Sequence, residues 1–494
     1  MEIHVKKWDE LTSYRTPEWM KKAKFGIYTH WGVYSVPGFG PNVSWYPYKM
    51  YQEGTDQYAY HCKHYGHPSK VGYKDLIPMF TGEKFNADEW AELFFKAGAK
   101  FAGPVAEHHD GFSMWNSKVN RWNAANMGPK HDVAGELERA VRKRGMYYMA
   151  AFHHAENWKF FPHWVREYDT SDPQYADLYG EAHNVDWGSE KRYMPEGIRF
   201  NPEAAGSVDM QWFLQDLPGE TFHERWFLKM KEVIDAYHPD YIWFDFGLSY
   251  INDLYQRKFL TYYQDEAARN GQQVAISYKG NDLPVGSGMV DLEQGRFDRA
   301  TYHDWITDTT VDAGEAWGYM RDAKYKTSKS LIHYLADNVS KNGYLLLNVG
   351  PKPDGTIPEE AEKILLEMGE WLGVNGEAIY GTTTWRVSEE GPTRMVSSGA
   401  FCEMNEVAYT GQDIRYTMKD NNIYAIALGR MDDHVSLRGI FPMVYEGEIE
   451  KVSFLGDGKP LKFRKEGNRL IVETEGRGRN ETANVLKIER REIF

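Results

Sequence analysis

Adjacent histidines and an aspartate stand together in Ala106-Glu107-His108-His109-Asp110, at the end of an apolar segment. Imidazole and carboxylate groups can bind a metal ion, act as a catalytic pair or hold the hydroxyls of a polar ligand. Because successive strand residues point to opposite faces, His108 and His109 reach the same ion only where the chain curls. The motif alone therefore leaves all three chemistries open.

Polar residues end six other apolar segments, each of which is a predicted strand. The seven segments are 24–29 before His30, 101–106 before Glu107 to Asp110, 146–152 before His153 and His154, 241–244 before Asp245, 274–277 before Tyr278 and Lys279, 289–292 before Glu293, and 345–347 before Asn348. In a closed barrel of parallel strands these ends meet on one face, where the strand-to-helix loops build active sites. The pattern predicts an enzyme.

The order of the elements predicts parallel strands that are covered by helices. Predicted helices begin at the N-caps Asn86 and Asp132 or end at Pro239 or at Asn-Gly, and each runs into a short apolar segment. Such alternation is typical of a parallel sheet. About eight units of this kind close a (β/α)₈ TIM barrel. An open doubly wound sheet is the alternative, although no Gly-x-Gly-x-x-Gly turn follows the first strand.

A second domain is predicted after the barrel. From about Trp385 the helix patterns fade, and segments such as "NNIYAIALG" and "NRLIVETEG" read as short strands with Gly, Asn and Asp turns. We predict a catalytic barrel over residues 1–384 and a C-terminal antiparallel β-sandwich over residues 385–494. Support of the barrel is the ordinary role for such a domain, and glycan binding is the alternative.

Composition argues against several classes of function. The 494 residues include 72 acidic and 58 basic side chains, and the net charge of −14 argues against a nucleic-acid partner. The two cysteines, Cys62 and Cys402, cannot build a disulfide framework or a cysteine-rich metal site. The N-terminus lacks the apolar core of a secretory signal, and no apolar run is long enough to span a bilayer. We therefore predict a cytoplasmic protein with no membrane partner.

Two carboxylates could catalyse the hydrolysis of a glycoside. Asp245 ends the apolar segment Tyr-Ile-Trp-Phe, and Glu293 follows one or two strand–helix units later. Glycosidases place two carboxyl groups at the scissile bond, one ionised as nucleophile and one with a raised pKa as proton donor. The alternative is that Glu293 only pairs with Arg296 and that Asp245 only caps a loop. The many His, Trp and Tyr residues also suit a polyhydroxylated ligand.

These residues and their surroundings resemble the α-L-fucosidases of glycoside hydrolase family 29. The resemblance rests on "WMKKAKFGIYTHWGVYSVPGFG" (19–40), "EHHDGFSMW" (107–115), "YIWFDF" (241–246), "VDLEQGR" (290–296), "EAWGY" (315–319), "NGYLLLNVGPKPDGTI" (342–357) and "GEAIYGTTTW" (376–385). It covers nearly the whole chain and implies a barrel followed by a β-sandwich, with no cofactor and no metal. The implied activity removes terminal α-L-fucose from fucosylated oligosaccharides or glycoconjugates with retention of configuration.

The resemblance also implies the roles of individual residues. Asp245 would be the nucleophile that forms a fucosyl ester, and Glu293 would be the acid/base. The residues implied to hold the sugar are His30, Trp45, His108, His109, His154, Lys279 and Trp317. Many relatives carry a different acid/base Glu at the position of Ile306, and its absence here leaves Asp304 and Asp308 as alternatives to Glu293.

Two positions depart from the family pattern. Ser44 stands where relatives often have a sugar-binding Glu, and Phe246 stands where Gly often follows the nucleophile. We expect a loop residue such as Asp186 or Glu190 to replace the missing carboxylate.

Three alternatives to a fucosidase also remain open at this point. They are a related retaining galactosidase, an inactive carbohydrate-binding relative and a metal-dependent barrel hydrolase. An apolar wall for the methyl group of fucose would separate the first from a fucosidase, and Phe39, Phe246 and Trp317 are the candidates for it. A homo-oligomer is open as well.

Overall fold

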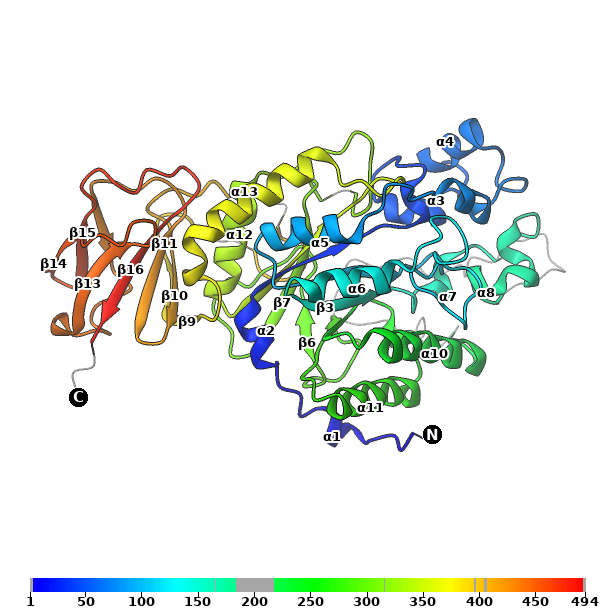
Figure 1. Ribbon diagram of the computed structural model, residues 1–494, viewed down its shortest axis with the longest axis horizontal. Coiled ribbons are helices and arrows are strands. Elements are labelled where there is room, and N and C mark those ends of the chain that lie inside the picture. The colour runs from blue at the N-terminus through cyan, green and yellow to red at the C-terminus, as the bar shows by residue number, and fades with distance from the viewer. Residues whose placement is uncertain are drawn as a thin grey trace.

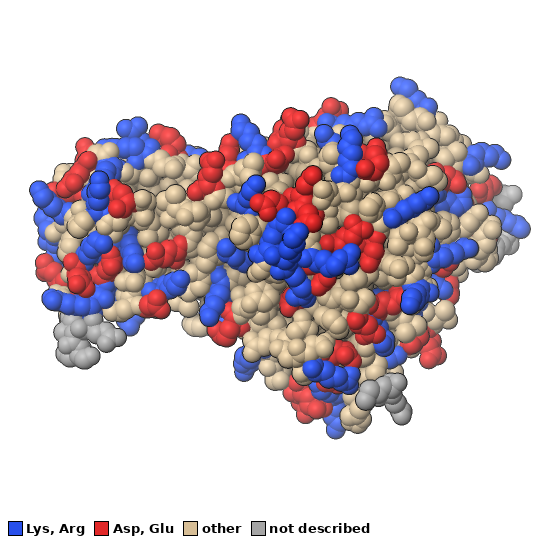
Figure 2. Space-filling model, viewed as in Figure 1, with Lys and Arg blue, Asp and Glu red and all other residues tan. Residues whose placement is uncertain are grey.

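The structure is a computed structural model that describes residues 3–163, 165–183, 217–314, 316–394, 397–403 and 407–491. A closed barrel of eight parallel strands lies beside a smaller domain of two antiparallel sheets (Figure 1). The predicted TIM barrel followed by an antiparallel sandwich is confirmed. Acidic and basic side chains mix over both domains on the face shown in Figure 2. Within the described ranges, no helix is long and apolar enough to cross a membrane.

The barrel strands follow one another around the barrel in chain order. They are β1 Phe25–Thr29, β2 Phe101–Glu107, β3 Tyr147–Phe152, β4 Tyr241–Phe244, β5 Ala275–Lys279, β6 Met289–Asp291, β7 Trp305–Thr310 and β8 Gly343–Val349. The sequence predicted all of them except β7. Its residues Trp-Ile-Thr-Asp-Thr-Thr are all buried, but four of them are polar, so an apolar pattern could not reveal the strand.

Helices cover the outside of the barrel. The main ones are α5 Ala87–Lys96, α6 Val133–Lys143, α10 Glu220–Tyr237, α11 Asp253–Arg269, α12 Ser328–Ser340 and α13 Glu359–Asn375. Shorter helices are α1 Trp8–Leu11, α2 Glu18–Ala23, α3 Tyr46–Lys49, α4 Asp56–His64, α7 Asn157–Phe160 and α8 Ala176–Tyr179. Asn86 and Asp132 accept hydrogen bonds from backbone N–H groups at the starts of α5 and α6, as the capping pattern predicts.

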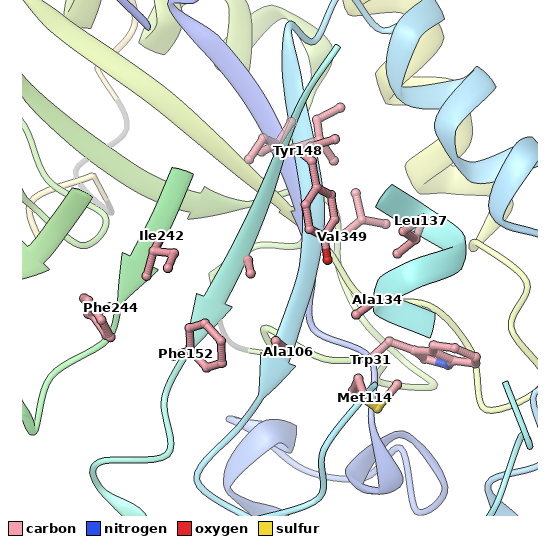
Figure 3. Packing of buried hydrophobic residues seen from close by; sticks show 14 of the residues in the cluster. Trp31, Ala106, Met114, Ala134, Leu137, Tyr148, Phe152, Ile242, Phe244 and Val349 are labelled. Carbon is pink, nitrogen blue, oxygen red and sulfur yellow. The ribbon is translucent and has the colours of Figure 1, made fainter. Parts of the chain in front are cut away.

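Strand alternation divides the apolar residues of the barrel into an inner and an outer layer. On β3, Met149 and Ala151 pack inside the barrel, whereas Tyr148 and Phe152 pack against the covering helices. Figure 3 shows this outer layer, which includes Leu137 of α6. The same alternation continues past the ends of β1, β3 and β4, so at these strands it decides which polar residue enters the mouth of the barrel.

The second domain is a sandwich that docks on the barrel through one of its sheets. The sheet β13-β16-β11-β10-β9 contains Ile449–Phe454, Asn484–Arg490, Asn422–Ala427, Ile414–Lys419 and Thr383–Glu390, and the sheet β12-β15-β14 contains His434–Leu437, Arg469–Glu473 and Lys462–Glu466. The predicted boundary between residues 384 and 385 lies inside β9. On β11, Ile423 and Ala425 point into the sandwich, whereas Tyr424 and Ile426 belong to the core of the barrel.

Candidate active site

Alternate residues at the carboxyl ends of the strands build one polar cluster in the mouth of the barrel. Tyr28 of β1 and Trp243 of β4 pack inside the barrel. Two positions further along the chain, His30 and Asp245 enter the mouth, and both contact His153. The predicted convergence of polar strand ends therefore follows from the period of two residues in a strand.

Asp245 is held by two histidines. Its Oδ2 accepts a hydrogen bond of 2.9 Å from Nδ1 of His153 and lies 3.3 Å from Nε2 of His109. Burial alone would raise the pKa of Asp245, but the charges and hydrogen bonds of His153 and His109 outweigh burial and hold that pKa well below its usual range. Asp245 is therefore ionised at neutral pH.

The four histidine rings of the mouth are in mutual contact. The ring of His108 lies 4.3 Å from that of His109 and 4.6 Å from that of His153, and His30 lies 5.0 Å from His153. Burial holds the pKa values of His30 and His108 well below the ordinary value, so both rings are neutral. Burial acts on His109 in the same direction, but the Asp245 carboxylate outweighs it and the pKa of His109 is raised. The cluster thus offers neutral and charged rings to a ligand.

A bulge in β2 brings His108 and His109 to the same site. The register between β2 and β3 shifts between Val105 and Glu107, which breaks the strict alternation of side chains. Glu107 then points away from the mouth, and its Oε1 lies 2.5 Å from Nζ of Lys229 on α10. The chain therefore bends at this point in the way that lets His108 and His109 contact the same ligand.

The same residues are close enough together to hold a metal ion. Ligand atoms within 4.8 Å of one another come from two triads, His30 with His108 and His153, and His109 with His153 and Asp245. Nδ1 of His30 donates to Oδ1 of Asn348, and Nδ1 of His109 donates to the carbonyl of His153, each at 2.8 Å. Their Nδ1 atoms are thus occupied, which leaves Nε2 as the ring atom that a bound hydroxyl group or metal ion would meet. The geometry alone does not distinguish these two kinds of ligand.

Glu293 lies at the edge of a group of charges on β5, β6 and β7. Nζ of Lys279 lies 2.6 Å from a carboxylate oxygen of Asp291 and of Asp308, and 3.4 Å from Oε2 of Glu293. Burial raises the pKa of Glu293, and Asp308 and Asp245 add to this effect against the charge of Lys279, so that the pKa reaches about 7. Glu293 therefore carries a proton for part of the time at neutral pH.

Of the three predicted proton donors, Glu293 has the best position. Its side chain is 20% exposed, whereas that of Asp308 is 2% exposed and binds Lys279 and the hydroxyl of Tyr28. Asp304 directly precedes β7, so it lies at the opposite end of the barrel, where it accepts a hydrogen bond from the Tyr344 hydroxyl. Asp304 is therefore far from the mouth, and Asp308, although it belongs to the charged group there, is more deeply buried than Glu293.

His154, a predicted sugar ligand, does not enter the mouth of the barrel, whereas its neighbour His153 does. His154 points to the outer face of the barrel, where its ring packs 6.0 Å from Trp226 of α10 and 5.4 Å from Phe152. The reason is again alternation, because Ala151 points inward and the next inward position is His153. Applied strictly to this strand end, the period of two would have selected the histidine that enters the mouth.

Aromatic rings flank the histidines on two sides. The ring of Trp45 lies 5.3 Å from His109 and stacks on Phe246 at 6.2 Å with an interplanar angle of 12°. On the other side, the ring of Trp317 lies 5.4 Å from His30. The structure thus brings the predicted residues Trp45, Phe246 and Trp317 to the site.

The remaining predicted residues lie away from the histidine rings or outside the described part of the chain. Phe39 stacks on Tyr60 at 4.0 Å instead of on the site histidines. Ser44 is buried, with 2% of its surface exposed. Asp186 and Glu190 lie outside the described residues.

Asn348 of β8 is a residue of the mouth for which the sequence suggested no role. Its Oδ1 accepts a hydrogen bond of 3.0 Å from the backbone N–H of His30, in addition to the one from the imidazole. Its Nδ2 donates to the carbonyl of Trp317 at 2.5 Å. Asn348 therefore holds two predicted sugar contacts in place, and its position at a strand end was the only signal for it.

Comparison with known proteins relates the whole chain to one family. The α-L-fucosidase family model matches residues 2–377. Human plasma α-L-fucosidase is 31% identical over 94% of this chain and 87% of its own, and bovine tissue α-L-fucosidase is 30% identical over 94% and 86%. The crystal structure of Thermotoga maritima α-fucosidase in complex with fucose has a TM-score of 0.73 at 27% identity, and the match covers 98% of this chain and 99% of that one. The likeness therefore spans both domains.

Proposed function

The chain belongs to the α-L-fucosidase family of glycoside hydrolases, and from this premise we propose that it releases terminal α-L-fucose from fucosylated oligosaccharides or glycoconjugates with retention of configuration. The observation that carries the proposal is the difference between two carboxyl groups in the barrel mouth. Asp245 has a pKa well below its usual range, and Glu293 has a pKa of about 7. A retaining glycosidase needs this pair of an ionised and a protonated carboxyl.

In the first step Asp245 is the nucleophile. Both histidine contacts go to its Oδ2, so we assign the attack on the anomeric carbon to Oδ1. The bond between that carbon and the glycosidic oxygen breaks, and Glu293 gives its proton to the departing oxygen. The products are a neutral alcohol and a fucosyl ester of Asp245.

In the second step water hydrolyses the ester. Glu293, now a carboxylate, takes a proton from water while the water oxygen attacks the anomeric carbon and Asp245 leaves. Nζ of Lys279 lies 3.4 Å from Glu293 and stabilises its charge between the two steps. Two inversions at the same carbon give net retention.

The surrounding residues account for the binding of the sugar. His30, His108 and His109 offer ring nitrogens to hydroxyl groups, and the raised pKa of His109 favours its donor form. The stacked rings of Trp45 and Phe246 supply an apolar surface that suits the methyl group of fucose. A cytoplasmic location and a homo-oligomeric assembly stay predictions.

The proposal is tested with three chromogenic glycosides. We expect release of p-nitrophenol from the α-L-fucoside and much slower release from the two galactosides. The α-L-galactoside carries a hydroxyl where fucose has only its methyl group, and the β-D-galactoside belongs to the D series, so its ring substituents are arranged differently. Equal or faster release from a galactoside would assign the chain to the galactosidase alternative. No release from any of the three would contradict the proposed activity.

A further inference from the structure

A third carboxyl group, that of Glu156, lies along one wall of the proposed site. Its backbone N–H donates to the carbonyl of His153, the residue that holds Asp245. Further along this segment, the ring of Phe160 on α7 lies 5.2 Å from both Trp45 and His109. Segment 153–160 therefore contacts the site at both of its ends, and Glu156 lies between them.

Glu156 also packs against the turn that follows the proposed nucleophile. Gly247 has a φ of +103°, and a Cβ atom at this position would lie 3.1 Å from the backbone nitrogen and 3.4 Å from Oε2 of Glu156. The carboxyl group therefore contacts the loop that carries Asp245 and Phe246. A side chain at residue 247 would meet both a strained backbone and this carboxyl group.

One oxygen of Glu156 is buried without a hydrogen-bond partner. The hydroxyl of Tyr250 donates to the carboxyl group, but within the described part of the chain no group donates to Oε2. Nδ1 of His108 and Nε2 of His153 share this condition. Buried polar atoms without partners destabilise a protein, and a ligand hydroxyl relieves that cost. Glu156 thus shares a property with the proposed sugar-binding histidines.

The charges around Glu156 come from several elements. Burial raises the pKa of Glu156 to about 7, and Asp245 also raises it, whereas His109, Lys159 on α7 and the Tyr250 hydroxyl lower it. Near neutral pH the group is therefore present in both forms. The ionised form accepts a hydrogen bond from a sugar hydroxyl, and the protonated form can also donate one.

We infer that Glu156 binds a ring hydroxyl of the fucosyl unit and supplies the carboxyl group that Ser44 lacks. Ser44 precedes Trp45, and the ring of Trp45 contacts that of Phe160, so the segments of Ser44 and Glu156 pack against each other beside the site. Glu156 is a residue of substrate recognition, and Glu293 stays the proton donor. The inference rests on the proposed function.

The test compares the wild type with Glu156→Leu and Glu156→Gln on p-nitrophenyl α-L-fucoside and its 2-, 3- and 4-deoxy analogues. We expect Glu156→Leu to lower kcat/KM for the parent fucoside by about 10- to 100-fold, the range for a hydrogen bond to a charged group. Glu156→Gln keeps an acceptor oxygen, so its kcat/KM for the parent fucoside should fall less. On the one analogue that lacks the bound hydroxyl, the variants and the wild type have equal kcat/KM, because the contact is absent in all of them.

Two results would overturn the inference. One is an unchanged kcat/KM of both variants on the parent fucoside, and the other is an equal loss on all four substrates, since a purely structural role does not depend on a hydroxyl group. Melting temperatures show whether Glu156→Leu folds, and Glu156→Gln decides the matter if it does not. Glu224→Gln is the matched control, because Glu224 on α10 bonds to Lys258 and is expected to behave as the wild type.

Different results would contradict the proposed function and the inference about Glu156. A wild type that does not hydrolyse the parent fucoside would contradict the proposed function and the inference with it. An active wild type whose Glu156 variants show either of the two contrary results would contradict the inference alone.

Discussion

The mouth of the barrel and the contact between barrel and sandwich both bury charged side chains, but they balance the charges differently. We call Asp245, Lys279, Asp291, Glu293 and Asp308 the mouth cluster, and Asp337, Lys341, Glu389 and Arg415 the interface cluster. The interface cluster has as many acids as bases. The mouth cluster has four acids and one lysine, with histidines beside them.

In the interface cluster each charge lies beside an opposite one. Nζ of Lys341 lies 3.0 Å from Asp337 and 2.9 Å from Glu389, and Nε of Arg415 also pairs with Asp337. Burial would raise the pKa of Asp337, but Arg415 and Lys341 outweigh it and lower that pKa to about 2. Asp337 lies on α12, whereas Glu389 and Arg415 lie on β9 and β10, so the cluster joins the two domains.

In the mouth cluster the acids differ from one another because one lysine cannot neutralise them all. Burial and Asp308 raise the pKa of Asp291 well above its usual range, and that of Glu293 reaches about 7, whereas the histidines keep that of Asp245 low. Charge balance, together with burial, therefore separates a group that stabilises the fold from one that can transfer protons. Substitutions in the two clusters can break or sharpen this contrast.

The largest expected effect is that of Asp245→Gly on turnover. Without a carboxylate the fucosyl ester cannot form, and we expect kcat to fall by about 10⁴-fold or more, as for the loss of a catalytic nucleophile. The side chains that we propose to bind the sugar remain, so calorimetry should still detect fucose binding. Unchanged turnover would contradict the role of Asp245 and with it the function of the mouth cluster.

Asp337→Ala should lower the stability of the protein and leave its activity unchanged. It leaves Lys341 and part of Arg415 buried with less opposite charge, and we expect a loss of about 3–5 kcal/mol in the free energy of unfolding, measured by urea denaturation. The kcat/KM of the folded enzyme should stay close to that of the wild type.

Lys451→Ala is the control for this stability effect. Its partly exposed pair with Glu489 spans 3.1 Å, and its loss should change the free energy of unfolding by less than about 1 kcal/mol. A normal stability of Asp337→Ala combined with a loss of activity would reverse the assignment of the two clusters.

Glu293→Gln should lower kcat/KM on an alkyl fucoside by about 100- to 1000-fold, the usual contribution of a proton donor. The pH profile gives a second readout. Glu293 acts in its protonated form and has a pKa of about 7, so kcat/KM of the wild type should fall as the pH rises through about 7. The variant should lack this alkaline limb. A limb that persists in Glu293→Gln would show that another group donates the proton.

The smallest expected effect is that of a chelator. The two triads of ligand atoms within 4.8 Å would serve a metal ion as well as a sugar. If they hold hydroxyl groups, prolonged dialysis against EDTA leaves kcat/KM unchanged. A loss of activity that zinc or another divalent ion restores would favour the metal-dependent hydrolase.

Most of the fold could be predicted because its strands are apolar and its helices are capped. β7 could not, since Thr307, Asp308, Thr309 and Thr310 place buried polar groups on both faces of the strand, where tertiary partners satisfy them. The sandwich followed from its turns and short strands. Its docking did not, because the pairing of Asp337 with Arg415 joins residues that are distant in sequence.

The candidate site was predictable where strand alternation applies and less so elsewhere. Asp245 and His30 follow the period of two, and the same period selects His153 over His154. The meeting of His108 and His109 depends on a bulge that no local pattern announces. Glu156 lies in a loop. It lies beside the site because this loop, within segment 153–160, packs against Gly247.

The most direct test of the central claim is to identify the residue that becomes covalently bound to the sugar. A 2-deoxy-2-fluoro-fucosyl fluoride has a good leaving group, while its fluorine slows both steps, so the ester accumulates on a retaining enzyme. Mass spectrometry of the intact protein and of its peptides should find one fucosyl adduct per chain, on Asp245. An adduct on Glu293 or Glu156, or turnover of the reagent with no adduct at all, would contradict the account.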